Sequence, residues 1–121
     1  MVSTKLKPVL PSLREKKRYI VFEIISRENI SNLEAVSNAV MNCVLQLVGI
    51  LGAAKAGIIV LGNKWNSQLQ RGVIRTSNKH VEAVKASLSL INKIDSKDVI
   101  IKTIGVSGIL RKAEAKYLKV P

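Results

Sequence analysis

The chain has 121 residues, 47% of them hydrophobic, and its 20 lysines and arginines against 8 acidic residues give a formal net charge of +12. This length predicts one domain with a core large enough to fold without disulfides or metals. The hydrophobic fraction excludes an intrinsically disordered chain. The charge favours a polyanionic partner, either nucleic acid or an acidic membrane surface.

The net charge is concentrated at the two ends of the chain. Residues 1–20 contribute +5 and residues 102–121 contribute +4, whereas residues 21–101 contribute only +3. Such a distribution is typical of a binding surface for a polyanion. Basic ends that simply lie in water are the alternative.

Several classes of site are disfavoured by the residues present. Cys43 is the only cysteine, so no internal disulfide can form, which fits a reducing compartment and a cytoplasmic location. One cysteine and one histidine, His80, are too few for a zinc site. We expect Cys43 to be a small buried residue and His80 to have a structural role. Polar residues interrupt the apolar-rich segment 39–61, so no membrane span is predicted.

The first predicted elements are an arm and a strand. Residues 1–15 contain two prolines and no clear periodicity, which predicts an irregular basic arm. The β-branched and aromatic residues at 16–26 predict a strand. Strict alternation places one apolar set on the core side of this strand: Ile20, Phe22 and Ile24.

A long helix follows. The sequence Ser31-Asn32-Leu33-Glu34 has the pattern of a capping box with Ser31 at the N-cap. Apolar residues then recur at helical spacing as far as Gly52, which is predicted to end the helix. They are Leu33, Val36, Val40, Val44, Leu47 and Leu51.

The remaining elements complete a known plan. Apolar or β-branched runs predict strands at 57–61, 70–77 and 97–105, the first two forming a hairpin. A second helix is predicted from Ser77 or Asn78, with Val81, Val84, Leu88 and Ile91 inward. The order β-α-β-β-α-β predicts an α+β, ferredoxin-like (RNA-recognition-module-like) sandwich over residues 16–105. Both helices cover one face of the sheet, and the other face is expected to be open.

Residues 106–121 are predicted to form an additional basic helix, packed on or beside the domain. At 100° per residue, its lysines and its apolar residues fall on opposite sides. Contact with phosphates and simple exposure to water both fit the lysines. The cationic side comprises Lys112, Lys116 and Lys119, and the apolar side comprises Leu110, Ala113, Tyr117 and Val120.

The open sheet face predicts contact with RNA or with protein. Its third strand has no aromatic residue, so base stacking is not expected, whereas salt-dependent phosphate contacts by lysine and arginine are. Its half-apolar character also suits a protein partner. The residues expected in that surface are Tyr19, Val21, Ile25, Val73, Ile100 and Ile104.

No constellation of acidic, nucleophilic or ligating residues predicts catalysis. An enzyme of the acylphosphatase kind shares the predicted fold, but it needs a glycine-rich loop after the first strand. The segment SRENISNLE at that place has no glycine. An enzymatic role for the isolated chain is therefore not expected.

Three segments carry a family resemblance: PSLREKKRYIVFEIIS, RGVIRTSNKHVEAVKASLSLI and VIIKTIGVSGILRKAEAKYL. Together, and in this order, they resemble the archaeal ribonuclease P protein component 2 family, which is homologous to the Pop-five subunit of eukaryotic ribonuclease P and MRP. The resemblance covers nearly the whole chain. The segment of the first predicted helix is much less distinctive.

The resemblance implies a non-catalytic subunit of ribonuclease P, the ribonucleoprotein endonuclease that removes the 5′ leader from precursor tRNA. Catalysis would belong to the RNA subunit and its magnesium ions, and this chain would hold no catalytic residue, metal or cofactor. The implied partners are ribonuclease P RNA, precursor tRNA, protein component 3 and other protein subunits, with a homodimer or heterotetramer as the assembly. A general RNA-binding or ribosomal-type structural protein is the alternative.

An RNA-facing role is expected for basic residues within the resembling segments and the C-terminal helix. These residues are Lys16, Lys17, Arg18, Arg71, Arg75, Arg111, Lys112, Lys116 and Lys119.

Overall fold

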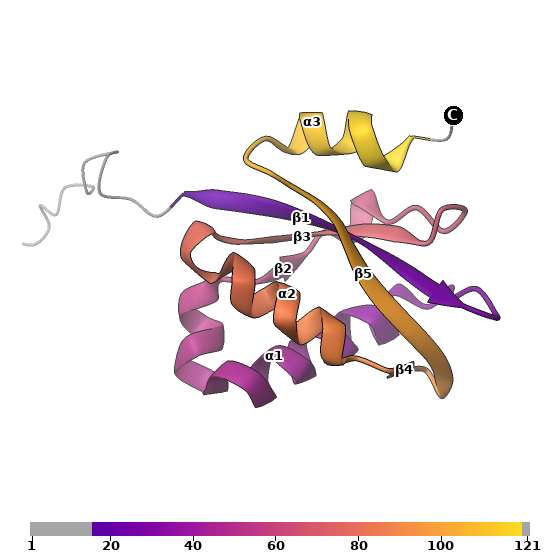
Figure 1. Ribbon diagram of the computed structural model, residues 1–121, viewed down its shortest axis with the longest axis horizontal. Coiled ribbons are helices and arrows are strands. Elements are labelled where there is room, and N and C mark those ends of the chain that lie inside the picture. The colour runs from indigo at the N-terminus through magenta and orange to yellow at the C-terminus, as the bar shows by residue number, and fades with distance from the viewer. Residues whose placement is uncertain (1–15, 120–121) are drawn as a thin grey trace, which may run out of the picture.

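A computed structural model describes residues 16–119 of the chain (Figure 1). The predicted arm at 1–15 and the predicted contact of Val120 lie outside the described residues. The strands are β1 (Lys17–Ser26), β2 (Ile59–Val60), β3 (Arg71–Ser77), β4 (Lys93–Ile94) and β5 (Lys97–Ser107). The α-helices are α1 (Leu33–Ala56), α2 (Val81–Leu90) and α3 (Leu110–Ala113), with 3-10 turns η3 (Gly62–Lys64) and η4 (Asn78–His80) and a π-helical turn η5 (Glu114–Leu118).

The five strands form one antiparallel sheet in the order β2-β3-β1-β5-β4. The predicted α+β, ferredoxin-like plan is confirmed, including the hairpin of β2 and β3. The sequence did not predict β4, because two residues are too few to produce an alternating pattern. β4 extends the sheet at one rim, beside β5.

The helices α1 and α2 cover one face of the sheet (Figure 1). Ile20, Phe22 and Ile24 of β1 point into this layer and are buried, as alternation predicts. They pack against valines of α1 and against Val84 and Leu88 of α2. Burying each side chain of this size contributes about 1.5–3 kcal/mol, so this layer is the main core.

The start of α1 differs from the prediction. Asn32, and not Ser31, is the N-cap: its Oδ1 accepts hydrogen bonds from the backbone N–H groups of Glu34 at 3.0 Å and Ala35 at 3.3 Å. The capping-box pattern placed the cap one residue too early. Asn is as good an N-cap as Ser, so the pattern alone did not distinguish the two residues.

The second half of α1 also departs from the prediction. Gly49 has φ 77° and ψ 177°, which breaks the helical path, and the helix then resumes and ends at Ala56 instead of Gly52. Leu51, which was expected in the core, is exposed after this break, and Leu47, expected there too, is exposed before it. Within residues 16–119, α1 is the one helix long and apolar enough to cross a membrane, with a mean hydropathy of 1.6 over 18 residues. Only 17% of that window is buried, although Val36, Val40 and Val44 of the first half pack in the main core.

The second face of the sheet is covered by the C-terminal helix, a name used here for α3 and η5 together (Figure 1). Ala113 packs against Val21 and Val73, and all three are buried. The expectation of an open face is therefore wrong at Val21 and Val73, which are not available as a partner surface while this helix is in place. The reason is that the apolar side of the helix and the apolar sheet face bury each other.

The other residues expected in the partner surface have different environments. Tyr19 and Ile104 are half-buried against the edge of the C-terminal helix. Ile25 and Ile100 lie opposite each other on β1 and β5, beyond the reach of that helix, and are 48% and 64% exposed. The sheet face is therefore open at this end, and Ile59 of β2 is also exposed, to 43%, on the same face.

Candidate nucleic-acid interface

Basic residues from separate segments lie at the end of the sheet where β1 begins. Strand pairing places Lys17 opposite Ser77, and the backbone N–H of Asn78 donates to the carbonyl of Lys16 at 2.7 Å, which brings η4 to this end. Tyr19 pairs with Arg75 on one side and with Ser107, just before α3, on the other. We call this cluster the basic end: Lys16, Lys17, Arg18, Arg75, Lys79, Arg111 and Lys112.

The turn before α3 lies close to the start of β1. A Cβ atom added at Gly108 would be 3.4 Å from Nη1 of Arg18, so this guanidinium lies beside the turn. Arg111 and Lys112, which follow at the start of α3, are exposed. The two basic ends of the chain, far apart in sequence, thus contribute to one surface.

The basic end is not neutralised by carboxylates of the described chain. None of its seven cations takes part in a salt bridge within residues 16–119, and the five salt bridges of that region all involve other cations. They are Lys64–Glu114, Arg71–Glu23, Lys85–Glu82, Lys93–Asp98 and Lys97–Glu28. A cluster of uncompensated positive charge attracts a polyanion and raises its association rate.

Arg75 is a partly dehydrated cation of the cluster. It is half-buried, paired in register with Tyr19 and Ile59, and its buried Nε has no hydrogen-bond partner among the described atoms. Electrostatic attraction is stronger where water is partly excluded. An anion at the accessible end of Arg75 would therefore be held more firmly than one at a fully exposed lysine.

Arg71 is not part of the basic end. Its Nε donates to Oε2 of Glu23 at 3.2 Å, and its Nη1 donates to the backbone carbonyl of Tyr117 at 2.8 Å. Glu23 offsets its charge, and both bonds join parts of the fold to one another. Its predicted RNA-facing role stays a prediction, with a structural role now evident beside it.

The last predicted cations lie further along the C-terminal helix. Lys116 is exposed, and its Nζ is 5.4 Å from the ring centroid of Tyr117, a cation–π distance. Lys119 is exposed just beyond η5. Sequence reasoning missed Lys79, since no motif marks it and only the pairing of β3 with β1 brings η4 beside Lys16.

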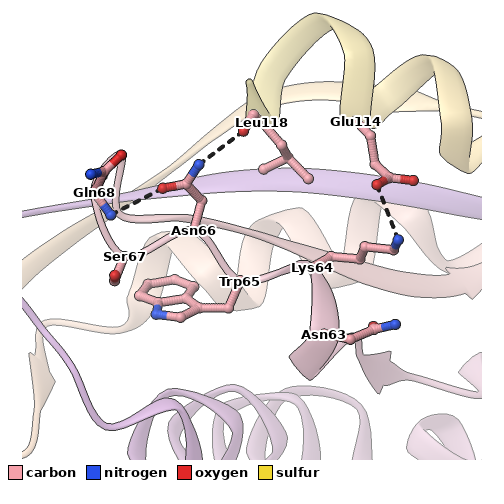
Figure 2. Close-up of a pocket in the computed structure, with 8 residues that line it drawn as sticks. All are labelled: Asn63, Lys64, Trp65, Asn66, Ser67, Gln68, Glu114 and Leu118. Atoms are coloured by element: carbon pink, nitrogen blue, oxygen red, sulfur yellow. Dashed lines mark hydrogen bonds and ion pairs between the residues drawn. The ribbon is translucent and has the colours of Figure 1, made fainter. Parts of the chain in front are cut away.

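A polar hollow of about 510 Å³ lies between the loop that follows β2 and the C-terminal helix (Figure 2). Lys64 and Glu114 form a salt bridge of 3.0 Å across it, and Nδ2 of Asn66 donates to the carbonyl of Leu118 at 2.9 Å. Oδ1 of Asn66 accepts from the backbone N–H groups of Gln68 and Leu69. These polar groups are occupied with one another, so they hold the helix to the loop.

The groups most often used in metal binding or nucleophilic chemistry have local environments in the described chain. Within residues 16–119, no three His, Cys, Asp or Glu side chains lie close enough together to hold a metal ion. Burial raises the pKa of the Cys43 thiol, and its Sγ donates to the carbonyl of Ser87 at 3.1 Å, so it is protonated at neutral pH. Nδ1 of His80 pairs with Oγ of Ser77 at 2.9 Å, a local contact at the start of α2.

Comparison with known proteins identifies the family. Residues 18–118 match the Rpp14/Pop5 family, and this range includes the sheet, both covering layers and most of the basic end. The chain belongs to the Rpp14/Pop5 family. The resemblance predicted from the three quoted segments is thereby confirmed.

Relatives in the Rpp14/Pop5 family match over almost their whole length. Ribonuclease P protein component 2 of Pyrococcus furiosus is 39% identical over 117 residues, covering 97% of this chain and 95% of that protein. The protein of the same name from Methanocaldococcus jannaschii is 40% identical over 117 residues, covering 95% and 82%. A chain in the cryo-EM structure of yeast ribonuclease MRP has the same fold, with a TM-score of 0.63, 14% identity and coverage of 88% and 81%.

Proposed function

We infer that this chain is a non-catalytic protein subunit of ribonuclease P, and we propose that its basic end binds the catalytic RNA and helps it remove the 5′ leader from precursor tRNA. The observation that carries the proposal is the sequence identity of 39–40%, over most of the length of both chains, to proteins named ribonuclease P protein component 2. The basic end adds physical support, because it is a positive surface without a carboxylate partner in the described chain.

The proposed mechanism is electrostatic. Folding an RNA active site brings phosphates close together, and cations must offset their repulsion. Lysines and arginines on a folded protein offset this repulsion. When they contact phosphates, condensed counterions are released from the RNA, so binding is favoured at low salt. The chain would then lower the magnesium concentration that the RNA needs. The magnesium ions and the chemistry would belong to the RNA subunit, and the chain itself would bind no cofactor.

Protein partners belong to the same proposal, with component 3 as the main one and a homodimer or heterotetramer as the assembly. Apolar side chains are exposed on the helical layer, most of all Ile50 at 79% and Leu51 at 76%, with Leu47 and Leu90 nearby. We propose that a protein subunit covers this surface, and we expect the complex to be cytoplasmic. Ile25 and Ile100 form the second, smaller candidate.

The proposal is tested by reconstituting the RNA subunit with this chain and its protein partner and measuring cleavage of precursor tRNA. Replacing Lys112→Glu and Lys116→Glu together should raise the magnesium concentration needed for half-maximal activity, because two phosphate contacts become repulsive. The matched control is Lys93→Glu with Lys97→Glu, an equal charge change on exposed salt bridges of β4 and β5. Equal activity of all three proteins at limiting magnesium would contradict the proposal for this helix.

The alternative of a general or ribosomal-type RNA-binding protein predicts a different preference. A competition experiment with ribosomal RNA separates the two functions. Stronger binding to ribosomal RNA than to ribonuclease P RNA would favour the alternative.

A further inference from the structure

The C-terminal helix is seated on the sheet by a close contact between an aromatic ring and a glycine. A Cβ atom added at Gly105 would overlap Cζ, Cε2 and Oη of Tyr117. The ring of Tyr117 therefore occupies the place that the Cβ atom of any residue other than glycine would take at position 105. We call the space over Gly105 that holds this ring the notch. Gly105 lies opposite Val21, so the notch is beside the buried contact of Val21 with Ala113.

Hydrogen bonds hold the same, C-terminal, part of this helix. Arg71 donates to the carbonyl of Tyr117 at 2.8 Å, and Asn66 donates to that of Leu118 at 2.9 Å. The last carbonyls of a helix have no partner within it, so these two donors replace water there. Glu23 in turn orients Arg71 through the 3.2 Å bond to its Nε.

These contacts decide where the helix lies, because the helix is too short to be stable alone. α3 has four residues and η5 five, well below the length at which an isolated helix forms in water. The seated helix begins close to the start of β1. Arg111 and Lys112 reach the basic end for that reason.

We propose that the notch at Gly105 and the tie from Arg71 position the C-terminal helix so that Arg111 and Lys112 complete the basic end. In this proposal Arg71 acts on RNA binding through its bond to Tyr117. This positioning role rests on the proposed function, since the basic end is the proposed RNA contact.

The first test is Gly105→Ala, which changes no charge. The probe is a transcript of archaeal ribonuclease P RNA, and its dissociation constant is measured between about 0.1 and 1 M salt. Each phosphate contact contributes about 0.7–0.9 to the slope of log affinity against log salt, so losing two contacts flattens it by about 1.5. The variant should then bind about 30-fold more weakly at 0.1 M salt if both proteins converge at 1 M.

Two further variants separate positioning from charge. Val106→Ala is the matched control, because Val106 is 41% exposed beside Gly105 on β5, and the salt slope of this variant should be unchanged. Arg71→Lys keeps the charge but cannot make both bonds of the guanidinium. For Arg71→Lys, the slope of log RNA affinity against log salt should flatten. An unchanged slope would show that Arg71 does not position the helix.

A double-mutant cycle links these residues to the helix cations. Arg111→Gln with Lys112→Gln should weaken RNA binding in the wild-type background and have little further effect in Gly105→Ala. Additive effects in the two backgrounds would overturn the inference, because the cations would then work without the notch.

Folding is checked by thermal unfolding and by the fluorescence of Trp65, which packs against the main core. If Gly105→Ala unfolds, Tyr117→Ala removes the ring without a clash and should flatten the slope equally. If the wild type binds RNA and the salt slope is unchanged in both Gly105→Ala and Tyr117→Ala, the positioning inference is overturned and the proposed function is not. Absence of salt-dependent binding by the wild type overturns the proposed function.

Discussion

Gln70 is a single buried polar side chain that joins two distant parts of the chain. Its Oε1 accepts from the backbone N–H of Ile30 at 2.8 Å, and its Nε2 donates to the carbonyls of Ile30 at 3.1 Å and Ser67 at 2.8 Å. The backbone at Gln70 is left-handed, with φ 54°. The amide thus satisfies both polar groups of a residue that precedes α1, where no strand is available to do so.

Replacing Gln70→Ala should lower the free energy of unfolding by about 2–4 kcal/mol, because the buried N–H and C=O groups of Ile30 lose their partners. Urea denaturation measures the change. Gln68→Ala is the control, since Gln68 is exposed in the same loop, and it should change stability by less than about 0.5 kcal/mol. Equal stability of the two variants would show that water replaces the amide of Gln70.

At the scale of elements, α1 shows how one backbone conformation redirects a helix surface. The φ 77° and ψ 177° of Gly49 are accessible almost only to glycine. The break rotates the second half of the helix relative to the first. Val36, Val40 and Val44 before it are buried, whereas Leu51 after it faces outward.

Replacing Gly49→Ala should destabilise the fold by about 1–3 kcal/mol, because alanine adopts this conformation only with strain. Thermal and urea unfolding measure the loss, and circular dichroism reports whether the helix straightens. Asn42→Ala, at an exposed position before the break, should cause no loss, since alanine is the better helix former. A Gly49→Ala variant as stable as the wild type would mean that α1 accepts a continuous helical path.

The elements differ in how far the sequence predicted them. Periodicity predicted the burial of Phe22 in β1 and of Leu88 in α2, because these patterns are local and unbroken. It was wrong for Leu51, since one glycine changed the helical phase. The expectation that Val73 lies on an open face was also wrong, because the cover over that residue comes from a helix that follows it by almost forty residues.

From the sequence we predicted the type of partner that the candidate interface suits, but not all of the residues that form it. Charge at both ends of the chain indicated a polyanion-binding surface, and the fold brings Arg18 and Arg111 to one end. Lys79 was missed because strand pairing alone places it there. The salt bridge of Arg71 with Glu23 was not visible either, since the two residues lie on different strands.

At the scale of the whole molecule, charge and exposed apolar surface occupy different places. The basic end lies where β1 begins and beside the start of the C-terminal helix, whereas Ile50 and Leu51 belong to the helical layer on the other face of the sheet (Figure 1). The proposed RNA contact and the proposed protein contact therefore involve different residues of the molecule.

Replacing Ile50→Ser with Leu51→Ser should weaken association with protein component 3 at least tenfold, because covering two such side chains is worth about 1.5–3 kcal/mol each. Isothermal titration calorimetry measures the affinity, and the salt slope of RNA binding should not change. Ile25→Ser with Ile100→Ser is the comparison. Loss of association in that pair alone would move the protein contact to the open end of the sheet.

β5 has a largely unpaired outer edge and a register shift against β1, and both affect how the chain behaves in concentrated solution. β4 pairs only with Lys97 and Asp98, so within the described chain most of the outer backbone of β5 has no neighbouring strand. A free rim of this kind is where one molecule adds to the next and fibrils begin. The register of β5 against β1 shifts at Ile104, which bends the rim, and Lys102 adds a charge to it. Both features oppose fibril growth, so the chain should stay dispersed at high concentration before RNA is added.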